Sequence, residues 1–121
     1  MPHDPELLPH ALAIQSRLEK EIALPYPAVL EAIDLLEAQD IYLLGWEALA
    51  VYPDGGFGAY PAPGIGGLSL DLPPADEDWH AAVERSATIN RDTIKTEWRT
   101  RKWTPPQEGV ELIFCITPHI S

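Results

Sequence analysis

Residues 41–52 constrain the fold most, because they read as one long apolar strand that ends in a tight turn. Both faces of this segment are apolar, which is typical of a strand in the middle of a sheet. Gly45 predicts a bulge or the close approach of another backbone. In the turn Pro53–Gly56, proline fixes φ, aspartate tolerates the bend and the two glycines accept positive φ. A short returning strand over 57–60 completes a predicted hairpin.

Hydrophobic spacing and proline positions predict the other elements. The predicted helices cover 4–22, 27–40 and 76–103, and two further strands cover 65–72 and 110–117. Pro9 weakens the first turn of the first helix, so a start near Pro9 is the alternative. The order α-α-β-β-β-α-β predicts an α+β fold, with an antiparallel-rich sheet of about four strands covered by helices. We expect one domain over 1–121, in which a helical N-terminal part, 1–40, packs on a core of 41–118.

The longest predicted helix begins with Asp76, Glu77 and Asp78, where acidic groups complement the positive end of the helix dipole. Trp79 and Trp98 follow on its apolar stripe, and we expect both to be core anchors. The predicted second helix directs an apolar face inward from residues Val29, Leu30, Ile33 and Leu36.

The formal charge is −11, and it is unevenly distributed. Residues 1–84 hold 15 acidic and 2 basic side chains, whereas 85–121 hold 4 and 6. An acidic body repels nucleic acid and anionic membranes and attracts a basic protein. Ordinary solubility charge explains the same composition. No signal segment or membrane-length apolar run is visible, so we expect a cytoplasmic protein.

Sequence motifs for catalysis or metal binding are absent. The four histidines lack metal-ligand spacing, no serine lies in a Gly-x-Ser-x-Gly elbow, and the glycine-rich stretches do not lead into a phosphate-binding helix. The single cysteine, Cys115, sits among apolar residues and is expected to be a core thiol. We therefore expect no cofactor, no metal and no enzymatic activity.

Glu47 is the one acid whose position needs an explanation, because its neighbours imply partial burial. A buried carboxylate is costly unless it is paired or hydrogen-bonded. One interpretation is a salt bridge to an arginine of the long helix. Another is a carboxylate offered to a partner at the sheet surface, and a third is general-acid chemistry.

Three short stretches carry a resemblance to a known family: Gly45-Trp46-Glu47, Tyr52-Pro53-Asp54-Gly55 and Phe114-Cys115-Ile116-Thr117. In these the chain resembles the immunity proteins of bacterial polymorphic toxin systems, and more narrowly the fortieth numbered immunity family. The resemblance covers about residues 40–118. It implies a non-enzymatic antidote that binds and occludes a cognate toxin domain, and it identifies neither the toxin nor the binding residues.

Two classes of function remain open from the sequence. The first is a toxin-neutralising protein that binds a basic surface, and an adaptor subunit of a larger complex would look the same. The second is a small enzyme or ligand-binding domain with a pocket around Glu47 and Trp46. For the first, we expect the partner surface to centre on the turn and on the start of the long helix. Its predicted residues are Glu47, Asp54, Phe57, Tyr60, Asp76, Glu77 and Asp78. The competing surface is the acidic N-terminal part, at Glu19, Glu31, Asp34 or Glu37.

Overall fold

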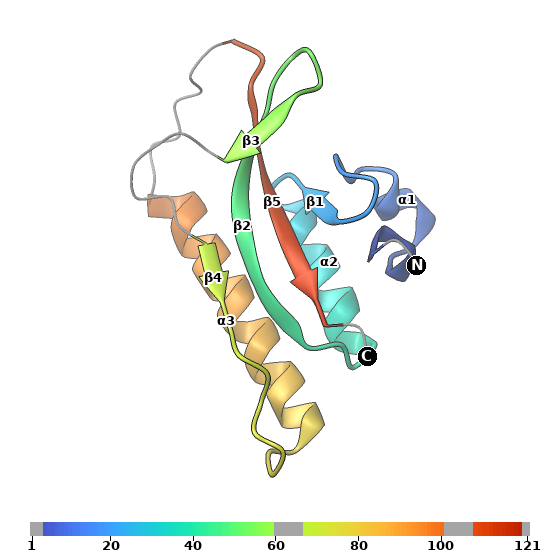
Figure 1. Cartoon of the computed structure of the whole chain (residues 1–121), viewed down its shortest axis with the longest axis vertical. Coiled ribbons are helices and arrows are strands. Elements are labelled where there is room, and N and C mark those ends of the chain that lie inside the picture. The colour runs from blue at the N-terminus through green and yellow to red at the C-terminus, as the bar shows by residue number, and fades with distance from the viewer. Residues whose placement is uncertain (1–3, 60–66, 101–107, 120–121) are drawn as a thin grey trace.

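The computed structural model describes residues 4–59, 67–100 and 108–119 (Figure 1). It confirms an α+β fold with an antiparallel sheet and helices packed against it. In chain order the elements are η1 (Asp4–Leu7), α1 (His10–Ala13), β1 (Ile22–Leu24), α2 (Ala28–Ala38), β2 (Leu43–Val51), β3 (Phe57–Ala59), β4 (Gly67–Ser69), α3 (Trp79–Thr100) and β5 (Glu111–Pro118).

The sheet is built around β2, as its apolar sequence predicted. Its strand order is β1-β5-β2-β3, and β4 pairs with β2 on the same edge as β3. All the pairs are antiparallel. In Figure 1 the long β2–β5 pair follows the long axis of the molecule. The β2–β3 hairpin lies at one end of this axis and the first turn of α3 at the other.

The predicted hairpin turn is confirmed, with one correction. Tyr52 N donates to Gly56 O at 2.7 Å, and the Asp54 carboxylate accepts from Gly56 N at 2.8 Å. Gly55 has the expected positive φ, 89°, whereas Gly56 does not have one. The turn needs the left-handed conformation at only one glycine because the Asp54 side chain closes the other side of the bend.

Gly45 marks both a bulge and a close backbone approach, as predicted. The β2–β5 register shifts between Leu43 and Gly45, and the φ of Gly45 is 156°. A Cβ atom here would lie 1.8 Å from the carbonyl oxygen of Leu68 in β4. Only glycine fits this position without a shift of the neighbouring strand.

The main core lies between one face of the sheet and the helices. Trp46, Ala48 and Ala50 of β2 point into it, while Ile113 and Cys115 of β5 belong to a second, smaller cluster on the other face. Helix α2 buries Val29, Ile33 and Leu36 as predicted, and Leu30 is partly buried.

The expected N-terminal helix over 4–22 is wrong. Two short helical turns, η1 and α1, cover part of it, and Ile22 begins the strand β1. Ile22 and Leu24 pair with Ile116 and Phe114 of β5 and are fully buried. The helical spacing of Ile22 to apolar residues upstream misled the prediction, because a three-residue strand is too short to show alternation.

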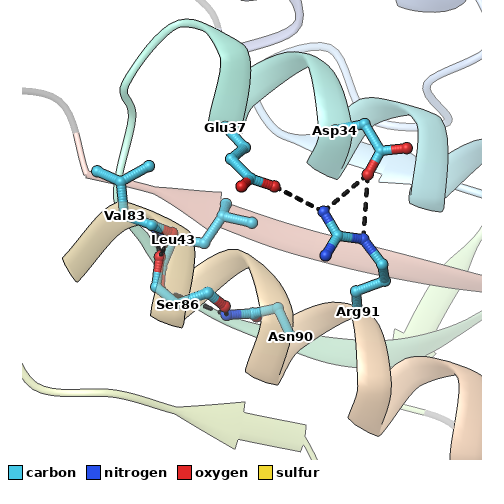
Figure 2. Close-up of polar contacts among 7 residues, drawn as sticks. All are labelled: Asp34, Glu37, Leu43, Val83, Ser86, Asn90 and Arg91. Carbon is cyan, nitrogen blue, oxygen red and sulfur yellow. Dashed lines mark hydrogen bonds and ion pairs between the residues drawn. The ribbon is translucent and has the colours of Figure 1, made fainter. Parts of the chain in front are cut away.

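A cluster of one arginine and two carboxylates joins α3 to α2 (Figure 2). Arg91 donates to Asp34 Oδ1 through Nε at 3.0 Å and through Nη2 at 2.7 Å, and Nη2 also donates to Glu37 Oε1 at 2.8 Å. Burial opposes the charge, but the hydrogen bonds to Glu37 and Asp34 raise the pKa of Arg91. Two of the four acids named for the competing N-terminal surface are therefore engaged in holding helices together.

Buried polar groups on α3 satisfy the backbone at the start of β2. The Ser86 hydroxyl accepts from Leu43 N at 3.1 Å and donates to Val83 O at 2.9 Å. Asn90 Nδ2 donates to Ser86 O at 2.8 Å (Figure 2). Ser86 and Asn90 are fully buried, although both side chains are polar.

Candidate partner-binding surfaces

The three acids before α3 have separate structural roles. Asp78 caps the helix, since its Oδ2 accepts from Ala81 N at 3.0 Å. Glu77 accepts from Arg85 at 2.9 and 3.2 Å, and this hydrogen bond raises the pKa of Arg85. Asp76 is exposed. Capping and a partner contact are compatible here, because a capping carboxylate keeps an oxygen towards solvent.

Trp79 is not the fully buried core anchor that was expected. It is 39% exposed, and Trp98 is 40% exposed. The indole N–H of Trp79 donates to Asp40 O at 3.0 Å, and its ring contacts those of Tyr42 and His119 at centroid distances of 5.9 and 6.3 Å. Trp79 lies at the end of the core because α3 begins where β2 begins, so its ring is held on one side and open on the other.

The end of helix α2 holds the Asp40 groups that contact Trp79 and His80. Helix α2 ends with Asp40 in the left-handed conformation, φ 64°, with Asp40 N donating to Glu37 O and Ile41 N to Leu36 O. This pair of bonds is the Schellman ending of a helix. It presents the Asp40 carbonyl to Trp79 and the Asp40 carboxylate to His80 Nδ1, at 2.7 Å.

The segment after β4 brings an exposed leucine and further acids to the same end of the sheet as Trp79. The Tyr42 hydroxyl donates to Asp71 O at 2.8 Å and so ties the segment after β4 to the same end of the sheet. The next residue, Leu72, is 51% exposed. We define the Trp79 surface by its members: Asp40, Asp71, Leu72, Asp76, Asp78, Trp79, His80 and His119.

The predicted partner surface is not continuous. Asp54 lies at the tip of the β2–β3 hairpin, at the opposite end of the molecule from Asp76 and Asp78 (Figure 1). The nine residues of β2 separate the two ends, a span of roughly 30 Å at about 3.3 Å per residue. Phe57 begins β3, but its side chain lies outside the described residues, as does all of Tyr60.

Glu47 is exposed, and the expected partial burial is wrong. In the described part of the chain it forms no ion pair with an arginine of α3. It lies on the sheet face that points away from α3, whereas the neighbouring Trp46 donates its indole N–H to Thr93 of α3 at 2.8 Å. Successive strand residues face opposite ways, so the Glu47 carboxylate and the Trp46 ring point to opposite faces of the sheet, although both residues line one shallow hollow.

A shallow hollow lies beside Glu47. It has a volume of about 460 Å³ and crosses β4, β2 and β5. Its polar side chains are Glu47, Ser69 and Thr117, and Gly45 lies between the last two in the sheet register. Ser69 and Thr117 were not predicted as site residues, because only the strand pairing brings them to Gly45.

Cys115 is confirmed as a core thiol. It is 3% exposed, and burial raises its pKa to about 12, with Glu21, Glu47 and Asp4 adding to the effect. At neutral pH the side chain is a neutral thiol, which is a poor nucleophile.

Among residues 4–59, 67–100 and 108–119, no group of three His, Cys, Asp or Glu side chains could hold a metal ion. No helix within these ranges is long and apolar enough to cross a membrane. A scan against protein-family models and searches of curated proteins and of solved structures found no match.

Proposed function

We propose that this chain is a non-enzymatic binding protein that neutralises a basic bacterial toxin domain by covering it, and that the Trp79 surface makes the contact. The observation that carries this proposal is a fixed, half-exposed tryptophan that contacts Tyr42, the residue that binds the segment of Asp71 and the exposed Leu72 to the same end of the sheet. Large apolar side chains exposed together are typical of binding surfaces.

The surface has the features of an energetic centre in a protein–protein interface. Tryptophan is among the residues that contribute most to such interfaces, provided that a partner removes it from water. Trp79 is already oriented by Asp40, Tyr42 and His119, so little side-chain entropy is lost on binding. Acids around it select a basic partner and accelerate encounter.

The charge balance of the whole chain supports the same partner. The net charge of −11 gives a long-range attraction for a cationic surface and repels nucleic acid. Several basic side chains are neutralised locally: Arg17 by Glu111, Arg85 by Glu77, and Arg91 by Asp34 and Glu37. An immunity protein is the specific form of this proposal, and it rests on the sequence resemblance described above.

Growth protection tests the proposal directly. A candidate toxin domain, sought among the genes beside that of this chain, is expressed with the chain, and the wild type is expected to restore growth. The decisive variant is Asp71→Lys with Asp76→Lys, which reverses two exposed charges at the Trp79 surface. The matched control is Asp54→Lys with Glu108→Lys, which makes the same change in net charge at exposed positions of two turns.

We expect the Trp79-surface variant to lose protection and to associate about tenfold more slowly with the toxin domain at low salt. The control variant, Asp54→Lys with Glu108→Lys, should keep both the protection and the wild-type association rate. Circular dichroism and urea midpoints verify that each variant is folded. Equal loss in the two variants would show that only net charge matters, and loss in the control alone would place the interface at the hairpin. A wild type that does not protect would refute the immunity function.

A further inference from the structure

The outer face of the sheet has a gap in its side-chain rows. Gly45 is the cross-strand neighbour of Ser69 in β4 and of Thr117 in β5. Neighbours across strands share a face, and each lies about 5 Å from the next. The row Ser69–Gly45–Thr117 therefore has hydroxyl side chains at both ends and only main chain in the middle, where the Leu68 carbonyl occupies the direction that a Gly45 side chain would take.

The Glu47 carboxylate borders the same gap. It lies two residues from Gly45 along β2, on the same face, roughly 7 Å away along the strand. Its cross-strand neighbour in β4, Gly67, also has no side chain, and its neighbour in β5 is Cys115. The three polar side chains and Gly45 all line the hollow of about 460 Å³, and we call this site the Gly45 slot.

The slot offers acceptors that the described protein does not use. Glu47, Ser69 and Thr117 are all exposed, and none of the three side chains forms a hydrogen bond or ion pair within the described residues. An ionised carboxylate is only an acceptor, and each hydroxyl can accept as well as donate. A cationic donor suits this set, whereas an anion would meet the carboxylate.

Arginine matches the slot better than lysine does. The acceptors come from three strands and surround the main chain of Gly45 at the floor of the hollow. A guanidinium is a planar fork with five N–H donors, so it can contact Glu47 and a hydroxyl simultaneously. A lysine ammonium is a compact charge and would contact one side of a gap this wide.

We propose that the Gly45 slot binds an arginine side chain of the basic partner, an inference that rests on the proposed function and adds a specific contact to it. The slot and the Trp79 surface are linked through the end of β5. Thr117 lies two residues before His119, and the His119 ring contacts Trp79. One partner can therefore cover Trp79 and insert an arginine beside Glu47.

The slot can be tested without the partner, using Nα-acetyl-arginine amide as the probe. The probe is titrated into ¹⁵N-labelled protein while amide shifts are followed, with the citrulline and lysine analogues as the neutral and ammonium comparisons. The variant is Glu47→Gln, which keeps the shape of an exposed strand residue. The matched control is Glu84→Gln, the same change at an exposed position of α3.

We expect saturable shifts at Gly45, Glu47 and Thr117 with a dissociation constant on the order of millimolar, typical of one small contact group. Glu47→Gln should weaken binding at least about fivefold, whereas Glu84→Gln should leave it unchanged. Non-saturating shifts, or equal binding of citrulline, would overturn the proposal. Equal binding of the lysine analogue would overturn the assignment to arginine.

The two tests fail in different ways. If the wild type protects cells but the arginine probe does not saturate, the slot inference is wrong and the Trp79 surface stands. If the probe saturates and depends on Glu47 while no protection occurs, the slot binds arginine but the neutralising function is wrong.

Discussion

Replacing Gly45 by alanine should destabilise the protein more than any other glycine-to-alanine change in the sheet. The added Cβ would lie 1.8 Å from Leu68 O and 2.8 Å from the carbonyl carbon. Real Cβ atoms essentially never approach within 3.0 Å, so Leu68 must retreat by about 1 Å or more. Because the atoms in contact are backbone, no side-chain rotation relieves the overlap.

The cost follows from what holds β4. This strand has only three residues in its ladder with β2, together with the bond from Leu70 N to Leu44 O at 2.6 Å. Two or three backbone hydrogen bonds contribute about 0.5–1.5 kcal/mol each. Strain at a φ of 156° adds on the order of 1 kcal/mol. We therefore expect Gly45→Ala to lower the free energy of unfolding by about 2–5 kcal/mol.

The matched control is Gly58→Ala in β3. A Cβ there meets no heavy atom within 4 Å, and the φ of Gly58 is not positive. Its effect should stay within about 0.5 kcal/mol. Urea unfolding measures both variants, and hydrogen exchange at the Leu70 amide reports whether β4 separates from β2. A loss below about 1 kcal/mol with Leu70 still protected would refute the close-approach argument.

Three further changes probe the core and its pH dependence. Arg91→Met should lower the free energy of unfolding by about 1–3 kcal/mol. A double-mutant cycle with Asp34→Asn should give a coupling energy of about 1 kcal/mol in urea unfolding, and zero coupling would show that the ion pair does not stabilise the fold. Ser86→Ala should cost about 1–3 kcal/mol because Leu43 N then has no partner in the interior, and an unchanged urea midpoint would contradict this. The Cys115 pKa is raised from 9.0 to about 12, so the unfolded chain releases this proton first. The contribution of the Cys115 thiol to the free energy of unfolding is complete below pH 9. It is lost between pH 9 and 12, by up to about 1.4 kcal/mol per pH unit. Cys115→Ala should remove that part of the slope, and identical slopes in the two proteins would refute it.

The sequence predicted the elements whose signal is local. The strand β2, the turn after it and the strand β5 each carry their pattern within about ten residues. Helix α2 likewise has its apolar stripe and a proline at its start. Gly45 could be interpreted because a glycine inside an otherwise apolar strand has few physical reasons to be there.

The parts that failed depend on contacts between distant segments. β1 is a strand because β5 pairs with it, and Ile22 and Ile116 are 94 positions apart in the chain. Glu47 was expected to meet an arginine of α3, but which face of β2 the helix covers is fixed by tertiary packing. Trp79 and Val83 share one helical stripe, yet only Val83 lies under the sheet.

The candidate surfaces show the same limit on a larger scale. The sequence identified acids at the hairpin and before α3, but it could not show that β2 and α3 begin at the same end of the molecule. That arrangement places the hairpin and the start of α3 at opposite ends (Figure 1). A single partner that touched both would have to span the length of β2. A partner that binds at the start of α3 meets Trp79 and Leu72 instead. The Gly45 slot is also within its reach, because Thr117 lies two residues before His119, which contacts Trp79. The position of the ring of Trp79 therefore decides which acids can act together, and a test of function should begin there rather than at the hairpin.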